Sequence, residues 1–156
     1  SDMISVEQEV ISVEAYLLLQ KYRFGDKLKY EISIDESCKE RLIPKLTVVT
    51  FVENACVHGM ENKTSECFVS VRVYKRNDDF IIEVEDTGNG IDDEKLIEIR
   101  EKAKSINIED LKSEKHIGIY NALLRLKMTM GDEYRFDIES EEGFSVSNVS
   151  RRNLYV

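Results

Sequence analysis

Polar side chains recur at helical spacing between Pro44 and Gly59, a segment that favours a helix. At 100° per residue, one stripe of this helix carries Thr47, Thr50, Asn54 and His58, and the opposite side carries Val48, Val52, Ala55 and Cys56. Glu53 flanks the polar stripe. Short amide, hydroxyl and carboxylate groups can orient a ligand or a metal ion, whereas a solvent face ordinarily carries Lys and Glu. The alternative is an ordinary amphipathic helix with a solvated face.

A carboxylate occupies an unusual place in the strand predicted for residues 80–86. Asp86 has the parity of Phe80, Ile82 and Val84, so its side chain points to the buried side of the sheet. An inward carboxylate is costly unless it is hydrogen-bonded. Two interpretations stay open. Either the strand ends one residue earlier and Asp86 caps the turn, or the carboxylate accepts a hydrogen bond from a ligand.

Glycines mark two further places where the backbone could approach a ligand. Gly88 and Gly90 follow Asp86 closely, and glycine permits positive φ and close backbone approach. Gly118 stands at the start of the last predicted helix, where backbone N–H groups attract phosphate. Each feature alone is equally compatible with a plain turn or an ordinary helix start.

Hydrophobic periodicity predicts the elements that must position these residues. A helix over residues 5–22 begins with a capping box of Ser5 and Gln8, Pro44 opens the second helix, and Gly59 closes it. Further helices are predicted over residues 92–102 and 118–130, strands over 28–34, 67–75, 80–86, 134–139 and 144–149, and a mobile segment over 103–116. This order predicts an α+β fold: a two-layer α/β sandwich, with a mixed, mostly antiparallel sheet and helices on one face.

Composition limits the classes of function. The 156 residues have a net charge of −9, which argues against a long nucleic-acid footprint because phosphate backbones favour clustered basic surface. No apolar run approaches the roughly 18 residues of a membrane span. Three widely spaced cysteines and two histidines fit a reduced, cytoplasmic protein without a zinc site.

Together and in order, three segments resemble the catalytic ATP-binding domain of sensor histidine kinases, and the YesM-like kinases in particular. That domain belongs to the ATPase group shared with Hsp90-type chaperones and DNA gyrase. Residues 44–46 and 52–59 are similar to the N box, residues 84–91 to the G1 box, and residues 117–126 with 131–132 to the G2 region. The resemblance covers nearly the whole chain.

The resemblance implies a role for each site residue. Asn54 would coordinate Mg²⁺ that bridges the phosphates of ATP, and Glu53 would be the catalytic acid residue that polarises the attacking group or orients the metal shell. Asp86 would accept a hydrogen bond from the adenine amino group. The other nucleotide-binding positions would be His58, Gly88, Gly90 and Gly118. An amide oxygen is a hard ligand of the kind that Mg²⁺ prefers.

Three departures from the family pattern concern the phosphate side of the pocket. Val57 stands where such kinases usually have Lys, Val49-Thr50 replaces a Gln-Pro pair, and His116 replaces the first glycine of the G2 region. These departures favour the alternative of a degenerate, non-catalytic domain with weak or no nucleotide binding. A third alternative, an anti-sigma-factor kinase that phosphorylates serine, fits the segment before the N box less well.

The resemblance also implies a division of the chain and a set of partners. Residues 1–24 would be an N-terminal helix that ends a dimerisation hairpin, and residues 25–156 the catalytic ATP-binding domain. The phosphate acceptor would be a histidine on the separate dimerisation domain, with a response regulator downstream, so this chain alone would not autophosphorylate. The fragment itself is expected to be soluble, and the full-length protein anchored in the cell membrane.

Overall fold

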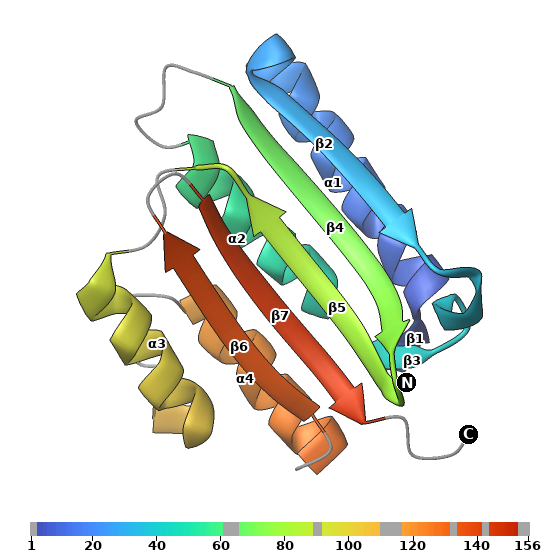
Figure 1. The fold of residues 1–156 in the computed structure, drawn as a ribbon, viewed down its shortest axis with the longest axis vertical. Coiled ribbons are helices and arrows are strands. Elements are labelled where there is room, and N and C mark those ends of the chain that lie inside the picture. Colours follow the sequence, from blue (N-terminus) through green and yellow to red (C-terminus); the bar gives the residue numbers. More distant parts are fainter. Residues whose placement is uncertain are drawn as a thin grey trace.

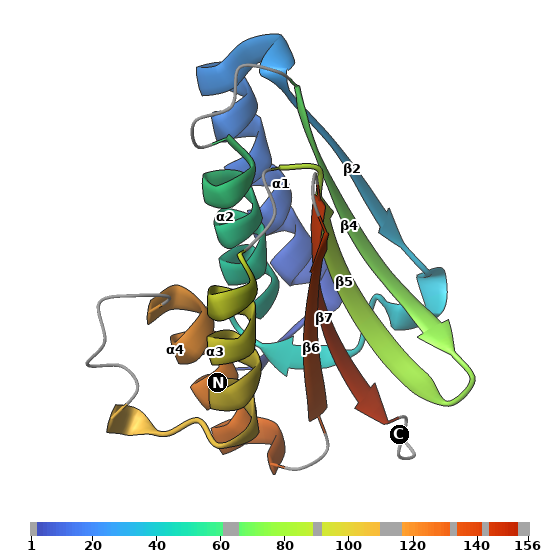
Figure 2. The same cartoon turned by 60° about the vertical axis from the view of Figure 1, so that its left-hand side comes forward.

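The computed structural model describes residues 3–60, 66–88, 92–109, 117–131, 134–141 and 144–152. Four helices lie on one face of a five-stranded sheet (Figures 1 and 2). The helices are α1 (Val6–Phe24), α2 (Thr47–Met60), α3 (Asp93–Lys104) and α4 (Ile117–Met130). The strands of this sheet are β2 (Leu28–Ile34), β4 (Cys67–Arg76), β5 (Asp79–Asp86), β6 (Tyr134–Glu141) and β7 (Phe144–Arg152). The predicted α+β sandwich is confirmed.

The sheet has the strand order β2-β4-β5-β7-β6. β2 and β4 run parallel, with Leu28 opposite Cys67, and the other neighbours are antiparallel. The mixed, mostly antiparallel sheet is therefore as predicted. A second, two-stranded sheet was not predicted: β1 (Met3–Ser5) pairs with β3 (Leu42–Pro44).

The core lies between the sheet and the helices. The predicted inward face of β4 is buried at Val69, Val71 and Val73. The predicted apolar stripe of α4 is buried too, at Ile119, Ala122, Leu123, Leu126 and Met130. The predicted capping box of α1 is present, because Ser5 Oγ accepts from the Gln8 N–H and Gln8 Oε1 accepts from the Ser5 N–H.

Two predicted boundaries are wrong. Pro44 does not open a helix but ends β3, opposite Met3, and α2 begins at Thr47. The physical reason is the turn between them, in which Leu46 has a φ of 69° that no helix continues through. Gly59 lies inside α2, which ends one residue later at Met60.

The mobile segment predicted for residues 103–116 begins too early in the chain. Ala103 and Lys104 belong to α3, and Ile106 is buried in the core. The Lys127 ammonium also donates to the Ile106 carbonyl at 2.9 Å. A single apolar side chain thus anchors a stretch that looks polar in sequence, and residues 110–116 lie outside the described residues.

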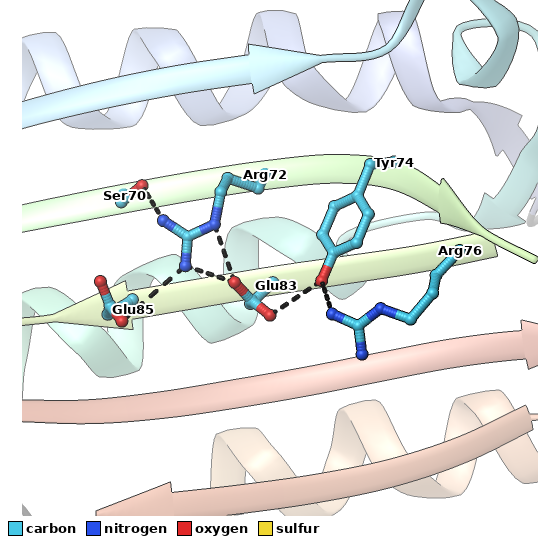
Figure 3. A network of polar contacts seen from close by, with 6 residues as sticks. All are labelled: Ser70, Arg72, Tyr74, Arg76, Glu83 and Glu85. Carbon is cyan, nitrogen blue, oxygen red and sulfur yellow. Dashed lines mark hydrogen bonds and ion pairs between the residues drawn. The ribbon is translucent and has the colours of Figure 1, made fainter. Parts of the chain in front are cut away.

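The sheet face opposite the helices carries a polar network (Figure 3). Arg72 of β4 stands opposite Glu83 of β5 and donates to it through two nitrogens, one of them at 2.7 Å. Arg72 also donates to Ser70 Oγ at 2.7 Å, and the Tyr74 hydroxyl donates to the same glutamate at 3.1 Å. The network ties β4 to β5, the strand that ends at Asp86.

Among the described residues, no helix combines the length and the apolarity that crossing a membrane would require.

Candidate functional site

Asp86 is the last residue of β5, and it is buried with only 3% of its surface exposed. Phe80, Ile82 and Val84 on the same side of the strand are buried as well. Asp86 Oδ1 accepts a 2.9 Å hydrogen bond from the Gly88 N–H. The strand does not end one residue earlier, because it includes Asp86, but the carboxylate does cap the turn that follows. Acceptance of a hydrogen bond from a ligand stays a prediction.

Thr87 fixes the point at which the chain leaves the sheet. Its N–H donates to the Phe68 carbonyl at 3.0 Å, and its hydroxyl oxygen accepts from the Phe68 N–H at 2.8 Å. These two bonds extend the β4–β5 ladder by one residue beyond Asp86. Sequence reasoning assigned Thr87 no role, although a β-branched hydroxyl residue directly after a strand was the available signal.

The polar stripe of α2 faces the first turn of α4. A methyl group added at Gly118 would lie 3.7 Å from Thr50 Cγ2, an ordinary van der Waals separation. Asn54 stands one turn after Thr50 on the same stripe and is half-buried. Thr50 therefore lies beside the first turn of α4, a helix N-terminus whose N–H groups favour an anion, and Asn54 follows it on the same stripe.

Two members of the predicted stripe use their hydroxyls on the backbone. The Thr47 hydroxyl donates to the Pro44 carbonyl, and the Thr50 hydroxyl donates to the Leu46 carbonyl, both at 2.7 Å. Thr47 is also completely buried, so its placement on an open polar face is wrong. The reason is that Thr47 occupies the first turn, where its side chain closes the preceding bend.

Cys56 connects α2 to the acid at the end of β5. Burial first of all, and then the neighbouring Cys67 and Asp86, raise the pKa of the Cys56 thiol to about 12. α2 packs against both β4 and β5. Its inner side therefore covers Asp86, while Thr50 on its polar stripe faces the first turn of α4.

Glu53 is exposed and lies next to Asn54 in the chain, on the side of α2 that approaches α1. Glu53 lies close enough to α1 to affect Tyr16. The pKa of the Tyr16 hydroxyl is raised to about 12, first of all by burial, then by Cys56 and then by Glu53. An exposed carboxylate beside a half-buried amide is accessible to a group arriving from outside this chain.

Within the described part of the chain, no three His, Cys, Asp or Glu side chains are grouped so that they could hold a metal ion alone. Asn54 would then be a single protein ligand. That fits Mg²⁺, which is commonly held by one or two protein groups together with substrate phosphates. Gly90 and His116 lie outside the described residues, and so does the side chain of His58.

Sequence reasoning missed Glu9, which is fully buried in α1. Its carboxylate contacts the start of α2, as described below. The signal was present, because Glu9 falls at the helical spacing of the buried residues Val6, Val10 and Val13.

The two-layer sandwich thus holds a buried acid, Asp86, at the end of a strand, and α2, the helix that covers it, also carries Asn54. The family described as histidine kinase-, DNA gyrase B- and HSP90-like ATPase matches residues 41–151. The chain belongs to this family, and the expected resemblance is confirmed.

Similar proteins include a sensor histidine kinase and a sensor protein. The chain is 31% identical over 140 residues to the sensor histidine kinase YesM of Bacillus subtilis, covering 90% of this chain and 22% of that protein. It is 34% identical over 151 residues to the sensor protein LytS of Bacillus cereus, covering 94% of this chain and 24% of that protein. The chain thus spans less than a quarter of the length of these relatives.

Solved histidine kinases share the fold. The Acinetobacter baumannii histidine kinase AdeS matches with a TM-score of 0.66 at 11% identity, over 98% of this chain and 67% of that one. The catalytic domain of the histidine kinase ThkA matches with a TM-score of 0.64 at 11% identity, over 97% and 94%.

Proposed function

We propose that this chain is the ATP-binding catalytic module of a two-component sensor histidine kinase. It transfers the γ-phosphoryl group of ATP to a histidine on a separate dimerisation domain. The observation that supports the proposal is the placement of α2, which covers Asp86 with the side that carries Cys56 and meets the first turn of α4 at Thr50, one turn before Asn54. One helix thereby connects Asp86, the proposed acceptor for the adenine base, with the groups proposed for the phosphates, which are Asn54 and the N–H groups at the start of α4.

Asp86 recognises the adenine end. Its carboxylate is oriented by the Gly88 N–H and is withdrawn from bulk water, so a hydrogen bond from an exocyclic amino group is strengthened there. A guanine base presents a carbonyl oxygen at the corresponding position, and two acceptors facing each other repel. Asp86 therefore favours ATP over GTP.

Asn54 and Gly118 serve the phosphate end. Mg²⁺, when bound, neutralises the developing charge on the phosphates. The Asn54 side-chain oxygen is the ligand that this chain offers, and the N–H groups at the start of α4 add donors for phosphate oxygens. Glu53, exposed beside Asn54, orients the imidazole of the incoming histidine by accepting its N–H.

The outer face of α1 supports the proposed division of the chain at residue 24. Ile11, Ala15, Leu18 and Tyr22 recur at helical spacing and are exposed, Tyr22 by 92%. A solvated helix would not repeat apolar side chains along its outer stripe. We propose that this stripe packs against the dimerisation hairpin. The full-length protein is anchored in the membrane, and its phosphohistidine passes the phosphoryl group to a response regulator.

One observation favours the degenerate alternative. Val57, at the position where such kinases usually carry Lys, is 58% exposed and offers phosphate no charge. In that alternative the domain keeps the fold and acts as an interaction module.

Calorimetric titration of this chain with ATP, with and without Mg²⁺, separates the two functions. The kinase proposal expects ATP binding that Mg²⁺ strengthens; no binding of ATP or ADP under either condition supports the degenerate domain. Radiolabelled ATP should then label a purified hairpin-containing partner in the presence of this chain. Label on this chain alone would contradict the proposed acceptor.

A further inference from the structure

Glu9 is a buried carboxylate that joins two helices. It lies on the inner side of α1, is fully buried, and accepts three backbone N–H bonds from the start of α2. Leu46 donates to Oε1 at 3.0 Å, and Val48 and Val49 donate to Oε2 at 2.9 and 3.2 Å. Three donors make burial of the charge tolerable.

These bonds replace a local helix cap. The first N–H groups of a helix need acceptors, but the residue before α2 is Leu46, which has no side-chain acceptor and a φ of 69°. In a capping box, one side chain accepts from the third helical N–H and another from the N-cap N–H. Glu9 does both, although it lies 37 to 40 positions earlier in the chain.

The same bend is held from a second side. Arg125 of α4 donates to the Lys45 carbonyl at 2.5 Å, directly before Leu46. The start of α2 is therefore defined by α1 and α4 together. Asn54 follows Val49 by five residues, about 7.5 Å along a helix axis. Because a helix transmits rotation rigidly over so short a length, the fixing of its first turn also fixes Asn54.

We propose that Glu9 is a positioning residue for the phosphate side of the site: it holds α2 to α1, so that the orientation of Asn54 depends on the position of α1. The inference rests on the proposed function, in which α1 continues the dimerisation hairpin and Asn54 meets the metal-bound nucleotide. A displacement of α1 then reaches Asn54 through three hydrogen bonds to one carboxylate.

The variant Glu9→Gln tests this role. It keeps the size of the side chain, removes its charge and turns an NH₂ group toward backbone donors. The matched control is Ser5→Ala, which removes the cap that α1 itself receives but no bond to α2. Both chains are labelled with ¹⁵N, and the backbone and Asn54 side-chain amide signals are followed together with hydrogen exchange.

For Glu9→Gln we expect exchange at Leu46, Val48 and Val49 to accelerate about tenfold or more, since hydrogen bonds to a charged acceptor are lost. The Asn54 side-chain signal should shift as well. In Ser5→Ala the exchange rates and the Asn54 signal should stay as they are in the parent chain. An unmoved Asn54 signal in Glu9→Gln, or an equal shift in Ser5→Ala, overturns the proposal.

If Glu9→Gln does not fold, Glu9→Asp provides the same readout with the charge retained and the reach shortened by one methylene. The functional readout is the ratio of ATP affinities with and without Mg²⁺, which Glu9→Gln should lower about tenfold. A parent chain that binds no nucleotide would defeat the proposed function, while the Asn54 signal would still decide the role of Glu9.

Discussion

The Gly88 N–H donates a 2.9 Å hydrogen bond to Asp86 Oδ1, so the carboxylate that ends β5 also sets the direction of the loop that follows. The bond fixes the plane of the carboxylate, and with it the direction in which both oxygens accept. Asp86 therefore has a conformational role and a proposed recognition role. Replacement of its carboxylate by the amide of asparagine can separate these two roles.

Asp86→Asn should weaken adenine recognition without unfolding the domain. Asparagine keeps an oxygen for the Gly88 N–H but replaces the other acceptor with a donor, so ATP affinity should fall about tenfold. The preference for ATP over GTP should disappear in calorimetric titration. The control is Asp26→Asn, because Asp26 is an exposed carboxylate just after the end of α1. An unchanged ATP/GTP ratio would remove Asp86 from the base site.

Asn54→Ala should abolish the effect of Mg²⁺ on ATP binding. The half-buried amide offers an oxygen ligand that alanine lacks, and alanine is the better helix former, so the fold should persist. Titrations with and without Mg²⁺ should give equal affinities in this variant, whereas Ser12→Ala on the exposed side of α1 should retain the difference. A persisting metal effect would place the ligand elsewhere.

Val57→Lys should strengthen ATP binding. The position is 58% exposed, so lysine requires no repacking. An added exposed charge near a phosphate contributes up to about 1 kcal/mol, roughly fivefold in affinity. The gain should shrink as salt is raised. Val57→Gln, which is of similar length but uncharged, should show no gain; if it gains equally, charge is not the reason.

Alkaline pH should destabilise the fold. The pKa of Cys56 is raised to about 12 and that of Tyr16 to about 12, both first of all by burial. A group whose pKa is raised on folding stabilises the fold below its unfolded pKa and ceases to do so as pH rises through the folded value. The free energy of unfolding should thus fall from about pH 9 toward pH 12.

Denaturant titrations between pH 8 and 11 measure this fall, and Cys56→Ala should make it shallower. An equal slope in that variant would exclude Cys56 as a contributor.

Arg72→Met should destabilise the domain by about 2 kcal/mol, because Glu83 would stay partly buried without its partner. Urea denaturation provides the measurement. Adding Glu83→Gln to Arg72→Met should restore part of the loss, since the partly buried charge of Glu83 is then removed and only the more exposed Glu85, 3.8 Å from Arg72 in the parent, loses its ion pair. A double variant less stable than the single one would show that Glu83 has another essential contact.

The strands and the helix faces could be predicted from sequence because they follow local periodicity. The alternation Val69, Val71, Val73 and the helical spacing of Ile119, Leu123 and Leu126 both lead directly to the buried faces. The inward Asp86 followed from the same parity argument. These are properties of neighbours in the chain.

The start of α2 could not be predicted in this way. Pro44 looks like a first helical residue, yet the acceptors for the first N–H groups come from Glu9, a residue of another helix. The β1–β3 pair could not be predicted either, because strands of three residues contain too few alternations to form a recognisable pattern. The contact between Thr50 and Gly118 likewise depends on how two helices pack.

The parallel pairing of β2 with β4 has a consequence for the order of folding. β4 and β5 are joined by a tight turn at Asn77 and Asp78, so their pairing closes a short loop. Leu28 meets Cys67 only after the chain between them, including α2, has come together. Loop-closure entropy makes such distant pairings slow. We therefore expect the β4–β5 hairpin to form early, and both β2 and the β6–β7 hairpin, whose partner strands lie far away in the chain, to dock later.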